Sequence, residues 1–159
     1  MILVTVGATY YPFDRLLAAV ETLEDDDVVV QHGASAVRPR NARCVEFMSF
    51  EGLLEHIRAA RIVVTHAGTG SVLVSLANGK SPLVVPRRRE FGEAIDDHQL
   101  DFGRALAPSG LITLVEEPEE LSEAISSVRE LNGSAPRVEL DGPLARDLGR
   151  YLRSVTGGA

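Results

Sequence analysis

The sequence predicts an α/β fold with a doubly wound parallel sheet, because short apolar runs alternate with segments of helical spacing from end to end. The apolar runs, which predict buried strands, are Ile2–Val6, Val28–Gln31, Arg43–Glu46, Ile62–Thr65, Leu83–Val85 and Leu111–Leu114. The predicted helices are Phe13–Leu23, Phe50–Ala59, Thr69–Ala77, His98–Ala107, Pro118–Leu131 and Pro143–Val155. This alternation favours a parallel sheet that is covered on both faces, with right-handed crossovers.

Proline, glycine and loop residues mark the boundaries of these elements. Prolines suit a first helical turn, whose N–H groups are unpaired in any case, and they stand at three predicted helix starts: Pro12, Pro118 and Pro143. Gly79 and Gly110 suit the ends of the third and fourth helices. The segment Gly33–Asn41 has no helical spacing, so we expect the second crossover to be a loop.

The predicted topology brings two loops of small residues together. No repeat or linker interrupts the pattern, so residues 1–159 are expected to form a single Rossmann-like domain. In the doubly wound strand order 3-2-1-4-5-6, the first and fourth strands are neighbours, and ligands bind beyond their carboxyl ends. The loops that follow these strands, beginning at Gly7 and at His66, would meet at that point.

Composition limits the function classes. The formal net charge of −7 argues against a general nucleic-acid binder, which needs a basic face. The single cysteine, Cys44, cannot form an internal disulfide, and no apolar segment approaches the roughly 20 residues of a membrane span. We therefore expect a cytoplasmic protein whose contact with a membrane, if it has one, is made through a partner.

The sequence His66-Ala67-Gly68-Thr69-Gly70-Ser71 predicts an anion site. It joins a β-branched run to a helical one, and the N–H groups of a helix N-terminus attract phosphates. It is not a P-loop, since no Gly-Lys-Ser/Thr follows. It is a poor dinucleotide fingerprint as well, because Leu73 replaces the third glycine. The alternative is that the glycines only allow a tight strand-to-helix turn.

A second loop, after the fifth predicted strand, opens on the same side of the sheet. Its three arginines, Arg87, Arg88 and Arg89, are candidates for contacts with a diphosphate or with lipid phosphates, the alternative being a solvated loop. His98 and Gln99, at a helix start, can present donors and acceptors to sugar hydroxyls. For the preceding Asp96 and Asp97 we favour helix capping over metal binding, since no further ligands are close in sequence.

Several short motifs together resemble the glycosyltransferase family 28 C-terminal domain, especially its small free-standing forms. They are Thr5-Val6-Gly7-Ala8-Thr9, Phe13-Asp14-Arg15-Leu16, His66-Ala67-Gly68-Thr69-Gly70-Ser71 and Asp97-His98-Gln99. The resemblance covers nearly the whole chain. It implies the donor-binding half of a GT-B glycosyltransferase, which is inverting, uses no metal or other cofactor, and takes a UDP-sugar as substrate.

The resemblance also implies roles for individual residues. Gly7 and the loop of Gly68, Thr69, Gly70 and Ser71 would hold the donor diphosphate together with Arg87. Phe47 and Met48 would lie beside the base, and His98 and Gln99 beside the sugar. Larger family members carry an acidic residue for the ribose on the helix after the glycine loop, where this chain has Val74.

The catalytic base and the acceptor site are the missing parts of this interpretation. His66 is the candidate base, although a histidine at a strand end more often orients its loop. A membrane-associated partner subunit would hold a lipid-linked or glycan acceptor, with Pro143–Val155 either docking that partner or packing on its own domain. The alternative functions are a nucleotide-binding regulatory or scaffold module without transferase activity and, less favoured, a small NAD-dependent oxidoreductase domain.

Overall fold

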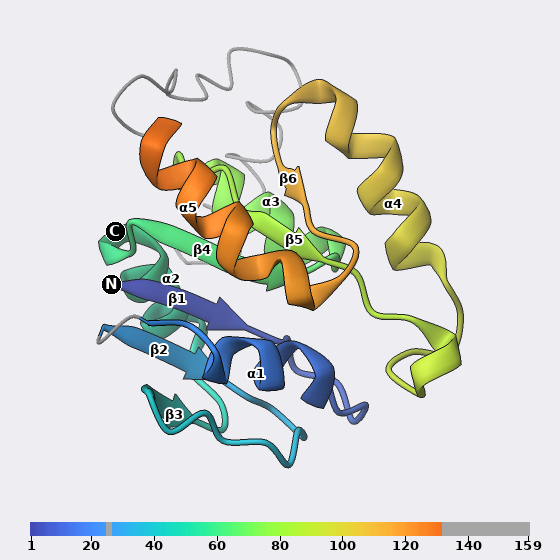
Figure 1. Cartoon of the computed structure of the whole chain (residues 1–159), viewed down its shortest axis with the longest axis horizontal. Helices are drawn as coiled ribbons and strands as arrows, with labels where there is room; N and C mark the ends of the chain where they lie inside the picture. The colour runs from blue at the N-terminus through green and yellow to red at the C-terminus, as the bar shows by residue number, and fades with distance from the viewer. Residues whose placement is uncertain (25–26, 132–159) are drawn as a thin grey trace.

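A six-stranded parallel sheet organises the molecule in the computed structural model, which describes residues 1–24 and 27–131. The strands are β1 (Ile2–Thr5), β2 (Val28–Gln31), β3 (Ala42–Val45), β4 (Ile62–His66), β5 (Leu83–Val85) and β6 (Thr113–Leu114). They lie in the order β3-β2-β1-β4-β5-β6, and every neighbouring pair is parallel. All strands therefore end on one side, on the right in Figure 1, which we call the carboxyl edge.

Helices cover both faces of this sheet. They are α1 (Asp14–Glu21), α2 (Phe50–Ala59), α3 (Thr69–Ala77), α4 (His98–Leu106) and α5 (Leu121–Leu131). The face that carries Val4 and Val64 packs against α1 and α5 (Figure 1). The opposite face, with Leu3, Val63 and Val84, packs against α2, α3 and α4. Burial of these apolar side chains, worth about 1.5–3 kcal/mol each, is the main source of stability.

The structure confirms the predicted α/β class, the parallel sheet and the strand order. The bounds of β2, β5, α2 and α3 agree with the sequence-based ranges, and the other elements differ from theirs by a few residues at one or both ends. Strand β6 is only two residues long instead of Leu111–Leu114, and a 3-10 turn, Pro118–Glu120, precedes α5. The predicted helix Pro143–Val155 lies outside the described residues.

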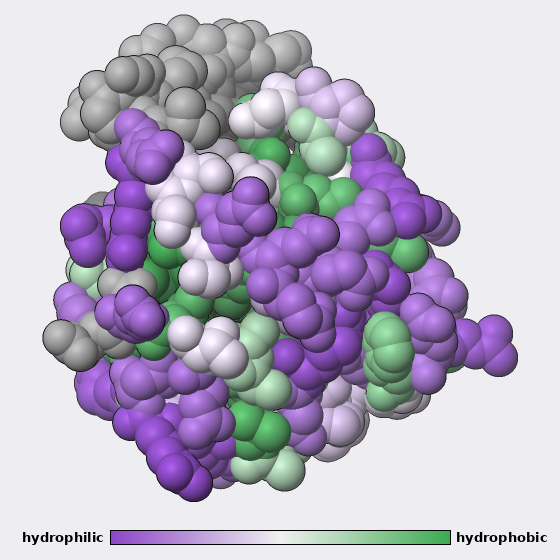
Figure 2. All heavy atoms as spheres, in the orientation of Figure 1, coloured by the Kyte–Doolittle hydropathy of each residue, from purple (hydrophilic) through white to green (hydrophobic). Residues whose placement is uncertain are grey.

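Hydrophilic side chains cover most of the face formed by α1 and α5, and hydrophobic ones show mainly between the elements (Figure 2). Across residues 1–24 and 27–131, no helix combines the length and the apolar character that crossing a bilayer requires. Large apolar side chains are nevertheless exposed in the loops of the carboxyl edge. They are Tyr10, Tyr11, Phe47, Phe91 and Ile95.

Candidate functional site

The loop between β4 and α3 leaves a helix N-terminus uncovered. Gly68 is the N-cap residue of α3 and offers no side chain to the first turn. Within the part of the chain that the structure describes, no acceptor pairs with the main-chain N–H groups of Thr69, Gly70 and Ser71. Unpaired N–H groups at the positive end of a helix dipole are suited to bind a phosphate. A Cβ atom on Gly70 would meet nothing within 4 Å, so this end of the helix faces open space.

The imidazole of His66 fills the space between Gly7, which follows β1, and Gly68, which follows the neighbouring strand β4. A Cβ on Gly7 would lie 2.6 Å from His66 Cε1, and a Cβ on Gly68 would lie 2.2 Å from His66 Nε2. Gly7 also has a φ of +80°, which side-chain-bearing residues rarely adopt. Both glycines are therefore required by packing against the ring, and the β1 and β4 loops meet as the predicted topology requires.

His66 is neutral at physiological pH. Burial and, to a smaller degree, the nearby Arg87 cation together lower the pKa of its imidazole to about 4, although a hydrogen bond to the Thr5 carbonyl opposes both effects. A neutral imidazole can donate and accept hydrogen bonds but carries no charge to attract a diphosphate. The ring shapes the loop, and the catalytic role expected of His66 stays a prediction.

Gln31 ties together three segments of the carboxyl edge. Its side chain accepts a hydrogen bond from the Thr5 hydroxyl, and its Nε2 donates to the carbonyls of Gly7 at 3.1 Å and Glu46 at 3.3 Å. The side chain is buried. It therefore fixes the Gly7 loop relative to the segment that leads to Phe47.

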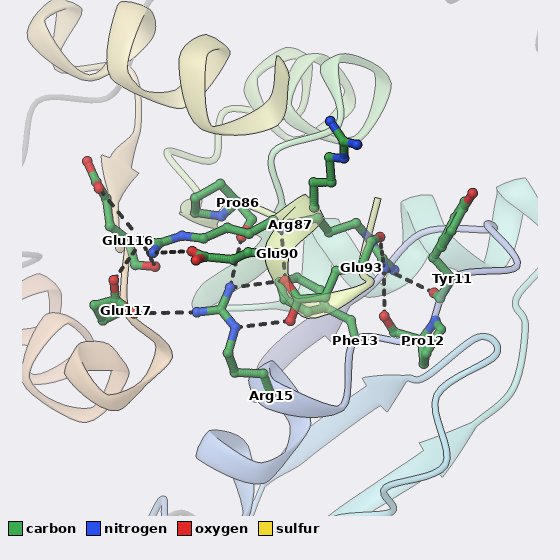
Figure 3. A network of polar contacts seen from close by, with 12 residues as sticks. Tyr11, Pro12, Phe13, Arg15, Pro86, Arg87, Glu90, Glu93, Glu116 and Glu117 are labelled. Carbon is green, nitrogen blue, oxygen red and sulfur yellow. Dashed lines mark hydrogen bonds and ion pairs between the residues drawn. The ribbon is translucent and has the colours of Figure 1, made fainter. Parts of the chain in front are cut away.

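Arg87 is turned into the protein interior. Its side chain is 1% exposed, and its guanidinium lies 4.7 Å from the centre of the Phe13 ring. Nη2 donates to the carbonyl of Val6 at 2.7 Å, and Nη1 donates to those of Tyr11, Pro12 and Glu93 at 3.0–3.1 Å (Figure 3). The expected contact with the diphosphate is thus not available to this guanidinium, because its two terminal nitrogens already hold the β1–α1 and β5–α4 loops together.

The other two arginines of the run differ from Arg87. Arg88 is half-buried, and its Nη2 lies 2.6 Å from Glu117 Oε1 (Figure 3). Arg89 has an exposed side chain, in line with the solvated-loop alternative. Beside them, the buried Glu93 binds Arg15 through both carboxylate oxygens, at 3.0 and 3.1 Å, and accepts from the Arg88 N–H at 2.9 Å. Two of the three arginines are thus engaged within the protein.

The start of α4 is held close to the same loops. Gln99 Oε1 accepts from the main-chain N–H of Arg87 at 3.2 Å, and among the described residues its amide nitrogen has no protein partner. His98 is exposed and bonds through Nδ1 to Asp96, whose carboxylate also accepts from the His98 N–H. This hydrogen bonding lowers the pKa of Asp96. Asp97 is the N-cap residue of α4, but the predicted capping by its side chain is wrong, because its carboxylate accepts from the Arg89 N–H at 2.9 Å instead of from the helix.

Phe47 and Met48 lie in the connection between β3 and α2. Phe47 is exposed, whereas Met48 packs against the buried cluster around Leu3. Val74 of α3 packs against the same cluster. Together with Gly7, His66, Gly68 and the start of α4, these residues occupy the carboxyl edge.

Sequence reasoning missed the residues that hold this edge together. The Arg15–Glu93 pair joins positions far apart in the chain, so no local pattern shows it. Arg87, however, continues the alternation of Leu83 and Val85, whose side chains face α1. This alternation indicates from the sequence that the Arg87 side chain points into the protein. Across the described residues, no group of three or more His, Cys, Asp and Glu side chains could hold a metal ion.

Residues 1–136 match the model of the glycosyltransferase family 28 C-terminal domain. The chain belongs to this family. A curated relative is the UDP-N-acetylglucosamine transferase subunit ALG13 of Yarrowia lipolytica, 31% identical over 122 residues that cover 67% of this chain and 60% of that protein. The mouse subunit of the same name is 34% identical over 121 residues, which cover 67% of this chain but 10% of that protein. The chain thus matches less than two thirds of the length of these family relatives.

Solved structures of glycosyltransferases share the fold of this family 28 domain. The kitacinnamycin glycotransferase has a TM-score of 0.59 at 21% identity, covering 99% of this chain and 39% of that one. MurG of Acinetobacter baumannii has a TM-score of 0.53 at 22% identity, and the match covers 80% of this chain and 40% of that one. At this level of identity the likeness establishes the Rossmann-like, GT-B type of fold and nothing about substrate.

Proposed function

We propose that this chain is the donor-binding subunit of a glycosyltransferase that moves a hexosyl group from a UDP-sugar to an acceptor. The observation that carries the proposal is the uncovered N-terminus of α3, where three main-chain N–H groups lack protein partners beside the Gly7 loop. Membership of family 28 and the similarity to UDP-N-acetylglucosamine transferase subunits support a UDP-sugar as the ligand.

In this proposal the acceptor hydroxyl attacks the anomeric carbon from the face opposite the diphosphate, with inversion. The bond from that carbon to the β-phosphate oxygen breaks, and UDP leaves with the electron pair. The negative charge that grows on the diphosphate is stabilised by the N–H groups of Thr69, Gly70 and Ser71, so the reaction needs no metal ion. The acceptor proton passes to a base near the acceptor, for which His66 is this chain's candidate.

A partner subunit supplies the acceptor site in this proposal. Tyr10, Phe91 and Ile95 are 98%, 52% and 74% exposed, and they stand on the two loops that Arg87 joins at the carboxyl edge. Large apolar side chains gathered on one edge favour a protein contact. We place the assembly at the cytoplasmic face of a membrane, with a lipid-linked or glycan acceptor held by the partner.

Calorimetric titration of the purified chain with UDP, UDP-N-acetylglucosamine, NAD and ATP tests the donor site. We expect the two uridine compounds to bind and NAD and ATP to bind at least tenfold more weakly. Absence of binding by any uridine nucleotide contradicts the proposal, and preferential binding of NAD supports the oxidoreductase alternative. If a uridine nucleotide binds but a reconstituted complex transfers no sugar, the chain is a regulatory module.

A further inference from the structure

The face of α3 that begins at Gly70 lines the open space in front of the helix. Residues four apart lie one above the other on a helix, so Val74 follows Gly70 on the same face. The space above Gly70 is empty to 4 Å. We take the nucleoside to extend along this open face, which places the pentose of a nucleoside diphosphate bound at the first turn of α3 near Val74.

The surroundings of Val74 are hydrocarbon. Its side chain is half-buried and packs in the same cluster as Met48 and Leu53, which belong to the start of α2 and the connection before it. Helix α3 carries no acidic residue along Thr69–Ala77. The Ser75 hydroxyl is buried and donates to the Ser71 carbonyl at 2.9 Å, so it is not free to bind a sugar hydroxyl.

A pentose 2′-hydroxyl is selected by a polar partner built to receive it, often a carboxylate. A site that hydrogen-bonds a hydroxyl rejects the analogue that lacks it, because its own buried polar group is then left unpaired. An apolar wall leaves nothing unpaired when the hydroxyl is missing. Discrimination at the 2′ position is therefore expected to be small where Val74 forms the wall.

We propose that the donor site of this chain does not select ribose, and that it accepts 2′-deoxyribonucleoside diphosphates as readily as UDP, with Val74 as the specificity-determining residue. This inference rests on the proposed function, since it concerns the same donor site. It extends the substrate class from UDP-sugars to sugars carried by deoxyuridine or thymidine diphosphate.

Calorimetry with UDP and dUDP, which differ only at the 2′ position, tests the inference on the chain itself. We expect the two dissociation constants to agree within about threefold, whereas Val74→Glu, which places a carboxylate on that face, should favour UDP at least tenfold. Ala77→Glu adds the same charge to an exposed position one turn further from the loop, and should leave the ratio near one. Circular dichroism checks that both variants are folded.

The outcomes separate this inference from the proposed function. A tenfold or greater preference of the wild-type chain for UDP over dUDP overturns the inference and leaves the donor site intact. An unchanged ratio in a folded Val74→Glu variant overturns the role of Val74. Failure of both nucleotides to bind contradicts the proposed function itself. A dissociation constant for thymidine diphosphate within threefold of that for UDP would further support the inference, with a natural deoxynucleotide as the ligand.

Discussion

The guanidinium of Arg87 donates through Nη2 to the main-chain carbonyl of Val6, 2.7 Å away, and so joins the loop after β5 to the end of β1. Burial lowers the pKa of Arg87 to about 10, although Glu93 opposes the shift, so the guanidinium remains charged at neutral pH. This buried cation is held mostly by main-chain carbonyl oxygens. Replacing Arg87 would leave those buried oxygens without hydrogen-bond donors.

We expect Arg87→Leu to lower the free energy of unfolding by about 3 kcal/mol, because buried carbonyls lose their donors. Urea denaturation measures the change. Arg89→Leu is the matched control, since Arg89 is exposed, and should change stability by no more than about 0.5 kcal/mol. Equal effects of the two substitutions would contradict the clamping role of Arg87.

Gly68→Ala should destabilise the protein by about 1–3 kcal/mol, because the new Cβ would lie 2.2 Å from the His66 ring. The backbone of Gly68, with φ −77°, accepts alanine without strain, so the ring contact is the cause. Adding His66→Ala should therefore recover part of the loss in a double-mutant cycle followed by urea denaturation. Strictly additive losses would show that the ring does not require Gly68.

Gly70→Ala separates ligand binding from stability. A Cβ there meets no protein atom within 4 Å, and alanine is the better helix former, so stability should be unchanged or rise by about 0.5–1 kcal/mol. The methyl group enters the space proposed for the diphosphate, so the calorimetric dissociation constant for UDP should rise at least tenfold. An unchanged dissociation constant would place the diphosphate elsewhere.

The protein should lose stability as the pH falls from about 6.5 to about 4. The pKa of His66 is near 4 in the folded protein and near 6.5 when unperturbed, so the unfolded chain binds a proton first. The contribution is complete above pH 6.5 and is on the order of 3 kcal/mol. Urea denaturation at pH 7 and pH 4.5 should show a smaller loss in His66→Gln than in wild type.

Glu93→Gln should cost about 2–3 kcal/mol of unfolding free energy, because the half-buried Arg15 guanidinium would lose the carboxylate that binds two of its nitrogens and keep only that of Glu117, 3.6 Å from Nη1. Glu90→Gln is the control, as Glu90 is exposed and lies 3.5 Å from Arg88. Thermal unfolding compares the two variants. A loss below about 1 kcal/mol for Glu93→Gln would mean that the pair is not a main support of the loops.

Local patterns in the sequence predict most of the helices and strands. The range Thr69–Ala77 is bounded by a glycine loop at one end and Asn78-Gly79 at the other, so its helix was predicted with the observed bounds. Strand β6 was predicted too long, because Leu111 and Ile112 are apolar for packing against α4 and are not strand residues. Composition alone does not distinguish these two uses of an apolar residue.

The candidate site was predictable in position but not in its internal contacts. The apolar run that predicts β4, together with the doubly wound strand order, places the glycine loop beside Gly7. Alternation along β5 indicates that Arg87 faces α1, but only the tertiary fold shows which main-chain carbonyls its guanidinium binds. The ring of His66 likewise fits between glycines that only the tertiary fold brings together.

The clamp made by Arg87 uses main-chain carbonyls, which every residue type provides. The side chains of Tyr11 and Pro12 are exposed and do not take part in it. Substitutions at these two positions therefore leave the frame of the carboxyl edge in place while changing the surface that it presents. The internal Arg87 cation thus helps to make the edge a fixed scaffold with replaceable side chains, so the surface of the proposed partner contact can be re-engineered without redesigning the fold.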